Sequence, residues 1–290
     1  MKKTDYLLLV FLTLLMGMGI LSYIVSCSKQ VSSQTPFSLS DSRDSVDIPI
    51  LMYHSISKDA SGENEYTISQ SRFEGDLKWL RNNGYTTIFP SQLAAYVEEG
   101  AMLPTKPVII SFDDGFANNY LYAYPLLQKY NMKAVIALIG AESDRSSDDI
   151  YRNPEHSNLT WGEVAILSRS GFIEFASHTY DLHSISGDRK GADKKSGESA
   201  ADYRQVLTAD LVKNQELIES AAGMAPMTFA WPFGAYPLDR SGDPILKDIG
   251  FDVTFTSYQH TSAVTQGKPE SLFGLGRYLR TPSFDITKII

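Results

Sequence analysis

Two adjacent carboxylates, Asp113 and Asp114, lie in the stretch SFDDGF (111–116), which directly follows an apolar run over residues 107–110. Buried carboxylates are costly unless they are paired, hydrogen-bonded or bound to a metal. An Asp-Asp-Gly sequence is also ordinary turn chemistry. The pair therefore indicates either a polar turn or a chemical site at the end of a buried strand, and other residues have to distinguish the two.

Two of the five histidines, His178 and His183, lie together in the stretch SHTYDLH. A spacing of five residues separates side chains by about 140° on a helix and places them on opposite faces of a strand. The two rings can therefore meet only where the chain bends. Two histidines and one carboxylate from the Asp pair would form a ligand set that catalytic zinc sites use, with an open position. The alternative is a pair of surface histidines in a loop.

The elements that must position these residues alternate along the chain. Apolar runs typical of buried strands occupy residues 48–53, 86–89, 108–112, 134–139, 173–176, 228–231 and 253–256. Amphipathic patterns predict helices over 72–82, 91–99, 120–130 and 202–222, and Thr160-x-x-Glu163 has the form of a capping box that begins another helix. Residues 186–200 read as a polar loop. This alternation favours an α/β fold with a parallel sheet that curls into a β/α barrel.

In such a barrel, chemistry occurs at the C-terminal ends of the strands. Asp113 and Asp114 follow the strand predicted over 108–112, and His178 follows the strand over 173–176. His54 follows the strand over 48–53. The shared placement favours a site over a simple turn.

Composition excludes some functions. The net charge is −8 and the pI is about 5.2, with no basic stripe, so nucleic-acid binding is not expected. Cys27 is the only cysteine, which rules out an intrachain disulfide and a cysteine-rich zinc site. Any metal must therefore be held by histidine and carboxylate.

The N-terminus predicts attachment to a membrane. Lys2 and Lys3 precede an uncharged run over residues 6–26, close to the roughly 20 residues that span a bilayer. The run ends in IVSC, which resembles a bacterial lipobox with Cys27 as the lipidated residue; an uncleaved signal anchor is the alternative. Both place the rest of the chain outside the cytoplasm. We expect residues 1–27 to be the leader or anchor, 28–47 a polar linker, and 48–290 the catalytic domain.

Three stretches together resemble one enzyme family. SFDDGF, SHTYDLH and FAWPFGAY (229–236) resemble the first three motifs of polysaccharide deacetylases of the NodB-homology group, carbohydrate esterase family 4. PILMYHSIS (49–57) and the stretch over 159–183 resemble the extracellular poly-β-1,6-N-acetylglucosamine N-deacetylase branch. The resemblance covers residues 48–280 and implies a distorted (β/α)7 barrel.

The resemblance also implies roles. It makes Asp113 the general base and Asp114, His178 and His183 the ligands of a divalent metal, with zinc expected and cobalt or nickel as substitutes. It makes His54 the general acid, with His260 as the late-chain alternative. His156 reads as a loop residue. Residues expected to contact substrate are Trp231, Pro232, Phe233, Gly234, Tyr236 and Arg277, and a backbone N–H in the 232–234 turn is expected to stabilise the oxyanion.

One position departs from the family pattern. The third motif commonly carries an arginine that partners the base, and Ala230 stands there instead. Arg277, in GLGRYLR, is either a substitute charge or part of a surface salt bridge.

We therefore expect a metal-dependent hydrolase that removes N-acetyl groups from poly-β-1,6-N-acetylglucosamine, acting as a monomer on an acetylated polysaccharide at the bacterial cell surface. Peptidoglycan or chitin N-deacetylation, xylan O-acetyl ester hydrolysis and non-catalytic carbohydrate binding are the alternatives. A glycosidase is disfavoured, because adjacent residues rarely supply the carboxyl separation of about 5 Å or more across a glycosidic bond.

Overall fold

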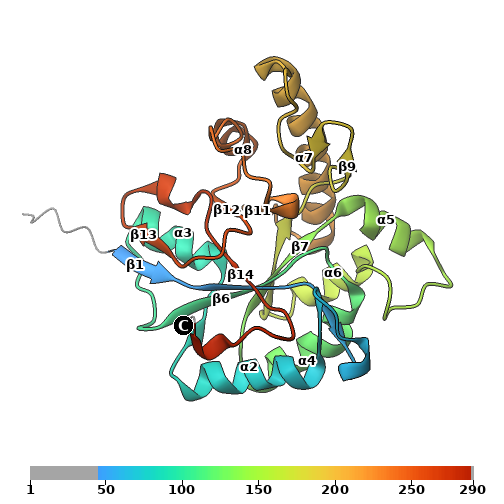
Figure 1. Ribbon diagram of the computed structural model, residues 1–290, viewed down its shortest axis with the longest axis vertical. Coiled ribbons are helices and arrows are strands. Elements are labelled where there is room, and N and C mark those ends of the chain that lie inside the picture. Colours follow the sequence, from blue (N-terminus) through green and yellow to red (C-terminus); the bar gives the residue numbers. More distant parts are fainter. Residues whose placement is uncertain (1–44, 289–290) are drawn as a thin grey trace, which may run out of the picture. The chain divides into compact units, whose positions relative to one another are not determined.

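The computed structural model describes residues 45–288. Figure 1 shows a curled parallel sheet with helices packed around it. The sheet contains β2 (Ile50–Tyr53), β6 (Pro107–Phe112), β7 (Ala134–Leu138), β8 (Ile173–Ser177), β11 (Thr228–Ala230), β12 (Val253–Phe255) and β14 (Tyr278–Leu279). These strands lie in the order β14-β2-β6-β7-β8-β11-β12, and every neighbouring pair is parallel. The short strand β5 (Thr86–Thr87) pairs with the beginning of β6.

Leu275 links the two ends of this sheet. Its N–H donates to the carbonyl of Thr254, and its carbonyl accepts from the N–H of Thr256, each at 2.8 Å. A few residues later, β14 pairs with β2. The chain between β12 and β14 therefore curls the sheet into the distorted β/α barrel that the sequence predicts.

Helices cover the sheet between successive strands. They are α2 (Gln70–Asn82), α3 (Pro90–Glu99), α4 (Tyr124–Tyr130), α5 (Gly140–Asp148), α6 (Trp161–Ser168), α7 (Ala200–Ala222) and α8 (Asp243–Ile249). In Figure 1, α2 and α4 lie side by side below the sheet. A π-helical turn, Asn119–Ala123, precedes α4 within the predicted helix over 120–130. The predicted capping box begins α6, since Thr160 Oγ1 accepts from the Glu163 N–H and the Glu163 side chain bonds back to Thr160.

Both faces of the sheet are buried, as in parallel sheets generally. Successive side chains of a strand point to opposite faces. On β6, Ile109 belongs to one apolar cluster, which includes residues of α3 and α7, whereas Ile110 and Phe112 belong to a second, which includes residues of α2 and α4. This burial fixes β6 in place, and with it the Asp113–Asp114 turn that follows.

Some elements differ from the prediction. The run over 48–53 is divided at Pro49 into β1 (Ser45–Ile48) and β2, because proline has no N–H to continue a ladder. β1 pairs instead with β13 (Ser262–Thr265). The segment over 186–200 is not wholly loop, since β9 (Ile185–Ser186) and β10 (Arg189–Lys190) form a small hairpin there.

The remaining short strands, β3 (Ser55–Ser57) and β4 (Thr67–Ser69), pair with each other beside β2. No helix within residues 45–288 is long and apolar enough to cross a membrane. The predicted leader or anchor over 1–27 and the lipidation site at Cys27 lie outside the described residues.

Candidate active site

A cleft of about 700 Å³ opens at the C-terminal ends of the barrel strands. Asp113, Asp114, His178, His183 and His54 all line it. Other lining residues come from the β3–β4 region, from the segment that follows β6 and from the loop after α5; they include Asn64, Tyr66, Thr67, Asn118, Glu155 and His156. The fold therefore gathers into one cavity the chemistry-bearing residues that the sequence places on separate strands.

The Asp-Asp-Gly stretch is both a turn and part of this cavity. The N–H of Asp113 continues the β6 ladder by donating to the Tyr53 carbonyl at 2.9 Å. Asp114 then adopts a left-handed backbone (φ 68°), which aspartate tolerates better than most residues. Asn158 donates to the Asp114 carbonyl at 2.7 Å and holds the turn from outside. The Asp-Asp-Gly stretch is therefore at once the polar turn and part of the candidate site, which the sequence left as alternatives.

The two histidines meet through the predicted bend. Thr179 has a left-handed backbone (φ 77°), and the rings of His178 and His183 lie 4.8 Å apart between centroids. Their Nε2 atoms lie 3.5 and 3.3 Å from Asp114 Oδ1. One ligand atom from each of these three residues lies within 4.8 Å of the other two, which is a grouping that can hold a metal ion.

Hydrogen bonding and burial favour cation binding by Asp114, His178 and His183. His178 donates from Nδ1 to the Ala230 carbonyl at 2.7 Å, which leaves Nε2 as the free acceptor. Burial lowers the pKa of His178 to about 3 and also lowers that of His183, so both rings are neutral, as metal ligation requires. Burial raises the pKa of Asp114 to about 6. A bound cation would offset that cost, so the donor set fits a divalent ion.

Asp113 has a different partner. Its carboxylate forms a two-pronged ion pair with the Arg277 guanidinium, with distances of 2.6 and 2.7 Å. Burial raises the pKa of Asp113, but the charge and hydrogen bonds of Arg277 outweigh this effect and hold the pKa well below its usual range. Asp113 is therefore ionised and available to accept a proton.

The alternative that Arg277 forms a surface salt bridge is wrong, because its side chain is only 1% exposed. Arg277 is also one of the residues that line the cleft. Its guanidinium is occupied by Asp113, by the Thr256 carbonyl and by Ser111. Contact between Arg277 and substrate stays a prediction.

His54 lines the cleft on the side of Tyr66, whose ring meets the imidazole edge-on at 5.0 Å. Its Nδ1 is buried and has no hydrogen-bond partner within residues 45–288. The competing residue, His260, is exposed, bonds weakly to Ser262 and is not among the lining residues. The geometry thus favours His54 as the histidine that can reach a bound group.

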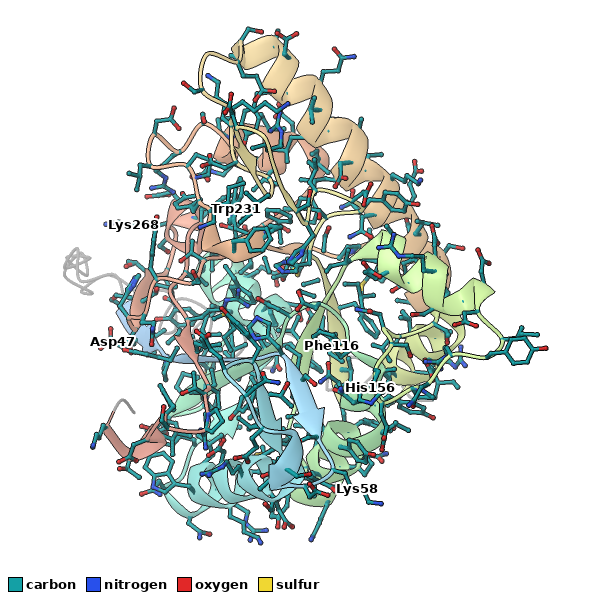
Figure 2. All side chains as sticks on the ribbon, turned by 45° about the vertical axis from the view of Figure 1, so that its right-hand side comes forward. Asp47, Lys58, Phe116, His156, Trp231 and Lys268 are labelled. Carbon is teal, nitrogen blue, oxygen red and sulfur yellow. The ribbon has the colours of Figure 1, made fainter. Side chains whose placement is uncertain are left out.

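His156 lines the cleft as well, together with Glu155 and Phe116 (Phe116 and His156 are labelled in Figure 2). No sequence pattern places His156 and Glu155 there, because they lie in a loop without periodicity. Glu155 accepts a hydrogen bond from Tyr122.

The third motif contributes fewer contacts than expected. Phe233 and Gly234 line the cleft, but Trp231 is fully buried in the apolar core and Pro232 is buried beside it. The expectation that Trp231 and Pro232 touch substrate is therefore wrong here, because their side chains pack inward. Phe233 has a left-handed backbone (φ 56°), and its N–H has no partner among the described residues.

Gly234 is required by close approach, since a Cβ there would lie 1.7 Å from Ser257 Oγ. Phe233, Gly234 and Ser257 also border a second cleft of about 900 Å³. Tyr236, Leu238, Tyr258 and Lys194 line this second cleft. Tyr236 thus lines the second cleft and not the first, and the two clefts share Phe233, Gly234 and Ser257 as lining residues.

Comparison with known proteins gives consistent matches. A family model described as polysaccharide deacetylase matches residues 101–254. The poly-beta-1,6-N-acetyl-D-glucosamine N-deacetylase of Escherichia coli K12 is 30% identical over 227 residues, covering 71% of this chain and 33% of that protein. The protein of the same name from Staphylococcus aureus MSSA476 is 28% identical over 195 residues, covering 66% and 61%. The chain thus spans about one third to three fifths of the length of these relatives.

Two solved structures are similar in fold and sequence. A de-N-acetylase from Aggregatibacter actinomycetemcomitans aligns with a TM-score of 0.70 at 27% identity, covering 83% of this chain and 98% of the other. IcaB from Ammonifex degensii aligns with a TM-score of 0.65 at 25% identity, covering 81% and 92%. The matched region contains the barrel and its cleft.

Proposed function

Because this chain belongs to the polysaccharide deacetylase family, we propose that it removes N-acetyl groups from a β-linked N-acetylglucosamine polymer, with poly-β-1,6-N-acetylglucosamine as the substrate. One observation carries the proposal: Asp114, His178 and His183 converge on one point, beside an ionised Asp113 that a separate arginine holds. The names of the relatives from Escherichia coli and Staphylococcus aureus support the choice of polymer.

The three converging residues would hold a divalent cation. Two imidazole nitrogens and one carboxylate suit zinc, and cobalt or nickel are expected to substitute. When bound, the ion supplies Lewis-acid polarisation of a water molecule and of the acetyl carbonyl. The hydrogen bond from His178 to Ala230 keeps the ring in the tautomer that this role needs.

Asp113 acts as the general base. It is ionised, it is buried, and His178 Nε2 lies 4.0 Å from its Oδ2, so its carboxylate borders the position of the ion. It accepts a proton from the attacking water as the water oxygen bonds to the acetyl carbon. Arg277 keeps the carboxylate charged and fixed in orientation until that step.

The departing group then needs a proton and the oxyanion needs donors. His54, which also lines the cleft, is the proposed acid that protonates the leaving amine as the carbon–nitrogen bond breaks, which yields acetate and a free amino sugar. The unpartnered N–H of Phe233 is the proposed oxyanion donor. The left-handed backbone at Phe233 and the glycine that follows it set the direction of this N–H.

A polymer rather than a single sugar suits the shape of the site. The second cleft borders the catalytic cleft at Phe233, Gly234 and Ser257, and it exposes Tyr258 and Leu238. Aromatic and aliphatic surfaces of this kind can pack against the apolar faces of sugar rings. We place neighbouring units of the polymer there.

We also propose that the N-terminal apolar segment tethers the enzyme at the outer face of the cell membrane, as a lipoprotein modified at Cys27 or as a signal anchor. The support is the sequence: an uncharged run of bilayer length after two lysines, ending in IVSC. A tether would place the barrel where a secreted polymer passes.

A direct assay tests the proposed function. The purified full-length chain, loaded with zinc, is incubated with poly-β-1,6-N-acetylglucosamine, chitin oligomers, peptidoglycan and acetylated xylan. We expect acetate and new free amines in equal amounts from the first polymer. Release of acetate from xylan without new amines would instead establish an O-acetyl esterase, and no release from any polymer would support a binding protein.

A further inference from the structure

The loop that brings the two histidines together is held by a carboxylate that is not part of the site. Asp210, on α7, accepts hydrogen bonds from consecutive backbone N–H groups of that loop: Tyr180 N–H bonds to Oδ1 at 2.7 Å and Asp181 N–H bonds to Oδ2 at 2.8 Å. Two consecutive residues of the bend between His178 and His183 are thus held by one side chain.

A second residue of α7 holds the strand end from which His178 emerges. Asn214 is fully buried, and its Nδ2 donates to the Leu138 carbonyl at 3.0 Å and to Ser177 Oγ at 2.8 Å. The same Leu138 carbonyl accepts from the His178 N–H at 2.9 Å. Asn214 therefore lies at the joint where β7 and β8 end, one residue before the first histidine.

The two side chains form a pair on one helix face, because residues four apart on a helix are neighbours. The Asn214 side chain fits only because position 140, which packs against it, is a glycine. A Cβ at Gly140 would lie 2.3 Å from Asn214 Oδ1, so only glycine fits at the beginning of α5. α7 lies beside β8 along this contact.

We propose that Asp210 and Asn214 are positioning residues that preset the two histidines for metal binding: Asp210 fixes the bend that carries His183, and Asn214 fixes the strand end that carries His178. The proposal rests on the proposed metal site. Neither side chain is expected to touch the ion or the substrate. Their effect is to reduce the reorganisation that the histidines undergo when the ion binds.

Asp210 is the better of the two residues to mutate, because its side chain is charged. A carboxylate has two oxygens that can accept from several N–H groups, and such bonds are stronger than those between neutral groups. The isosteric change Asp210→Asn keeps one accepting oxygen but turns an NH₂ group toward a backbone N–H. The loop should then lose its preset shape without loss of side-chain volume.

The test measures zinc affinity directly, on the full-length chain, by competition with a chromophoric chelator. We expect Asp210→Asn to weaken zinc binding roughly 10- to 100-fold, the usual effect of losing a partner that orients a ligand. The visible absorption of bound Co²⁺ should also change, because its shape depends on ligand geometry. Asp210→Glu keeps the charge and should retain an affinity between those of Asp210→Asn and wild type.

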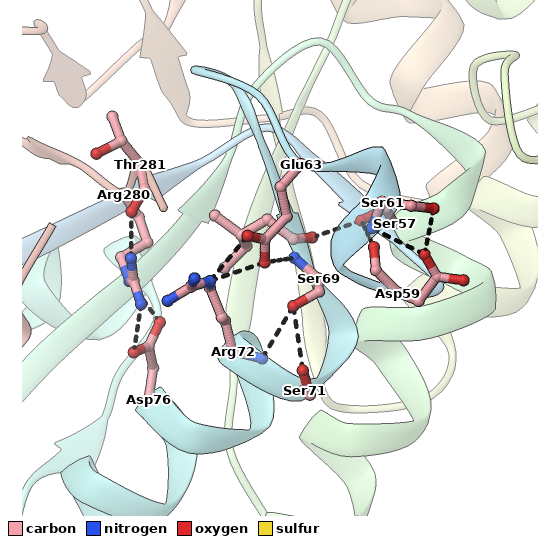
Figure 3. Close-up of polar contacts among 11 residues, drawn as sticks. Ser57, Asp59, Ser61, Glu63, Ser69, Ser71, Arg72, Asp76, Arg280 and Thr281 are labelled. Atoms are coloured by element: carbon pink, nitrogen blue, oxygen red, sulfur yellow. Dashed lines mark hydrogen bonds and ion pairs between the residues drawn. The ribbon is translucent and has the colours of Figure 1, made fainter. Parts of the chain in front are cut away.

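Asp76→Asn is the matched control. Asp76, on α2, is another buried carboxylate, held by Arg280 at 2.7 and 3.1 Å (Figure 3). The Asp76→Asn substitution should lower the melting temperature of the metal-free protein and leave its zinc affinity within twofold of wild type. This separates loss of stability from loss of positioning.

Zinc affinity within twofold of wild type in Asp210→Asn, with an unchanged Co²⁺ spectrum, would overturn the proposal. If Asp210→Asn does not fold, wild-type affinity and spectrum in Asp210→Glu would overturn it equally. The readout is separate from catalysis. If the wild-type chain binds zinc but deacetylates no polymer, the proposed function is wrong. The zinc affinities of the variants still decide the positioning role in that case.

Discussion

Arg277 and Asp113 form a buried, two-pronged ion pair between residues 164 positions apart in the chain. Arg277 precedes β14 and Asp113 follows β6, so the pair connects the two strands that flank β2 in the sheet. Ala230, which stands where the third motif commonly has an arginine, contributes its carbonyl, which accepts from His178. The charge beside the base therefore comes from a different element.

This pair predicts a shift in the pH dependence of activity. Burial by itself raises the pKa of Asp113, and Arg277 is the largest influence that lowers it. In Arg277→Met, the pKa of Asp113 should rise, so the base becomes protonated at a higher pH. The acid limb of the kcat/KM profile, measured between pH 4 and 9, should move to higher pH.

Arg280→Met is the control for that experiment. Arg280 lies three residues away in the same segment and pairs with buried Asp76 rather than with Asp113 (Figure 3). It should destabilise the protein while the acid limb keeps its wild-type position. An acid limb that moves equally in both variants would show that the segment as a whole, rather than the charge of Arg277, sets the profile.

The choice of general acid gives a second prediction. His54→Ala should reduce kcat by roughly 10²- to 10⁴-fold, which is the usual contribution of one positioned proton donor. Zinc affinity should be retained, because His54 is not one of the three grouped ligands. His260→Ala should have nearly wild-type kinetics, since that side chain is exposed and outside the cleft. Kinetics in which His260→Ala is inactive and His54→Ala is normal would reverse the assignment.

The second cleft predicts a dependence on polymer length. Tyr258 is 44% exposed and lines that cleft, while its backbone bonds to Arg277 and His260 do not need the ring. Tyr258→Ala should raise KM roughly threefold to tenfold for long oligomers, from the loss of one ring contact, and leave short oligomers unaffected. Tyr151→Ala removes a more exposed ring that lines neither cleft and should change neither value. Equal effects of Tyr258→Ala on short and long oligomers would place the polymer elsewhere.

The N-terminus gives a fourth prediction, which concerns location. Mass spectrometry of the mature protein, extracted from membranes, should find either a lipid-modified Cys27 or an intact Met1. The first result establishes the lipoprotein and the second the signal anchor. A soluble protein that begins after Cys27 would contradict both forms of attachment.

Much of the fold is predictable because it depends on local patterns. The apolar runs that form β6, β7 and β8 are buried on both faces, and buried parallel strands are continuous apolar segments in sequence. Strand ends can then be read directly, and in a β/α barrel the ends of parallel strands gather on one side. That is why Asp113, Asp114, His178 and His54 could be expected in one cavity.

Other features depend on contacts between distant segments and have no local signal. Whether Arg277 would be a buried partner or a surface cation was open, because its sequence neighbours are compatible with both. Asp210 and Asn214 lie within a long amphipathic helix, where a polar residue usually faces solvent. The inward direction of Trp231 depends on how β11 packs against α8 and the loop before it, which the motif alone does not specify.

Acetate release by zinc-loaded and chelator-stripped enzyme, measured on poly-β-1,6-N-acetylglucosamine beside Asp113→Asn, tests the central claim most directly. The wild-type chain should release acetate and free amines in equal amounts, lose this activity on removal of the metal and regain it with zinc. Asp113→Asn should bind zinc, because Asp114, His178 and His183 remain, but release no acetate. Full activity in the metal-free wild-type chain, or turnover by Asp113→Asn at the wild-type rate, would contradict the account.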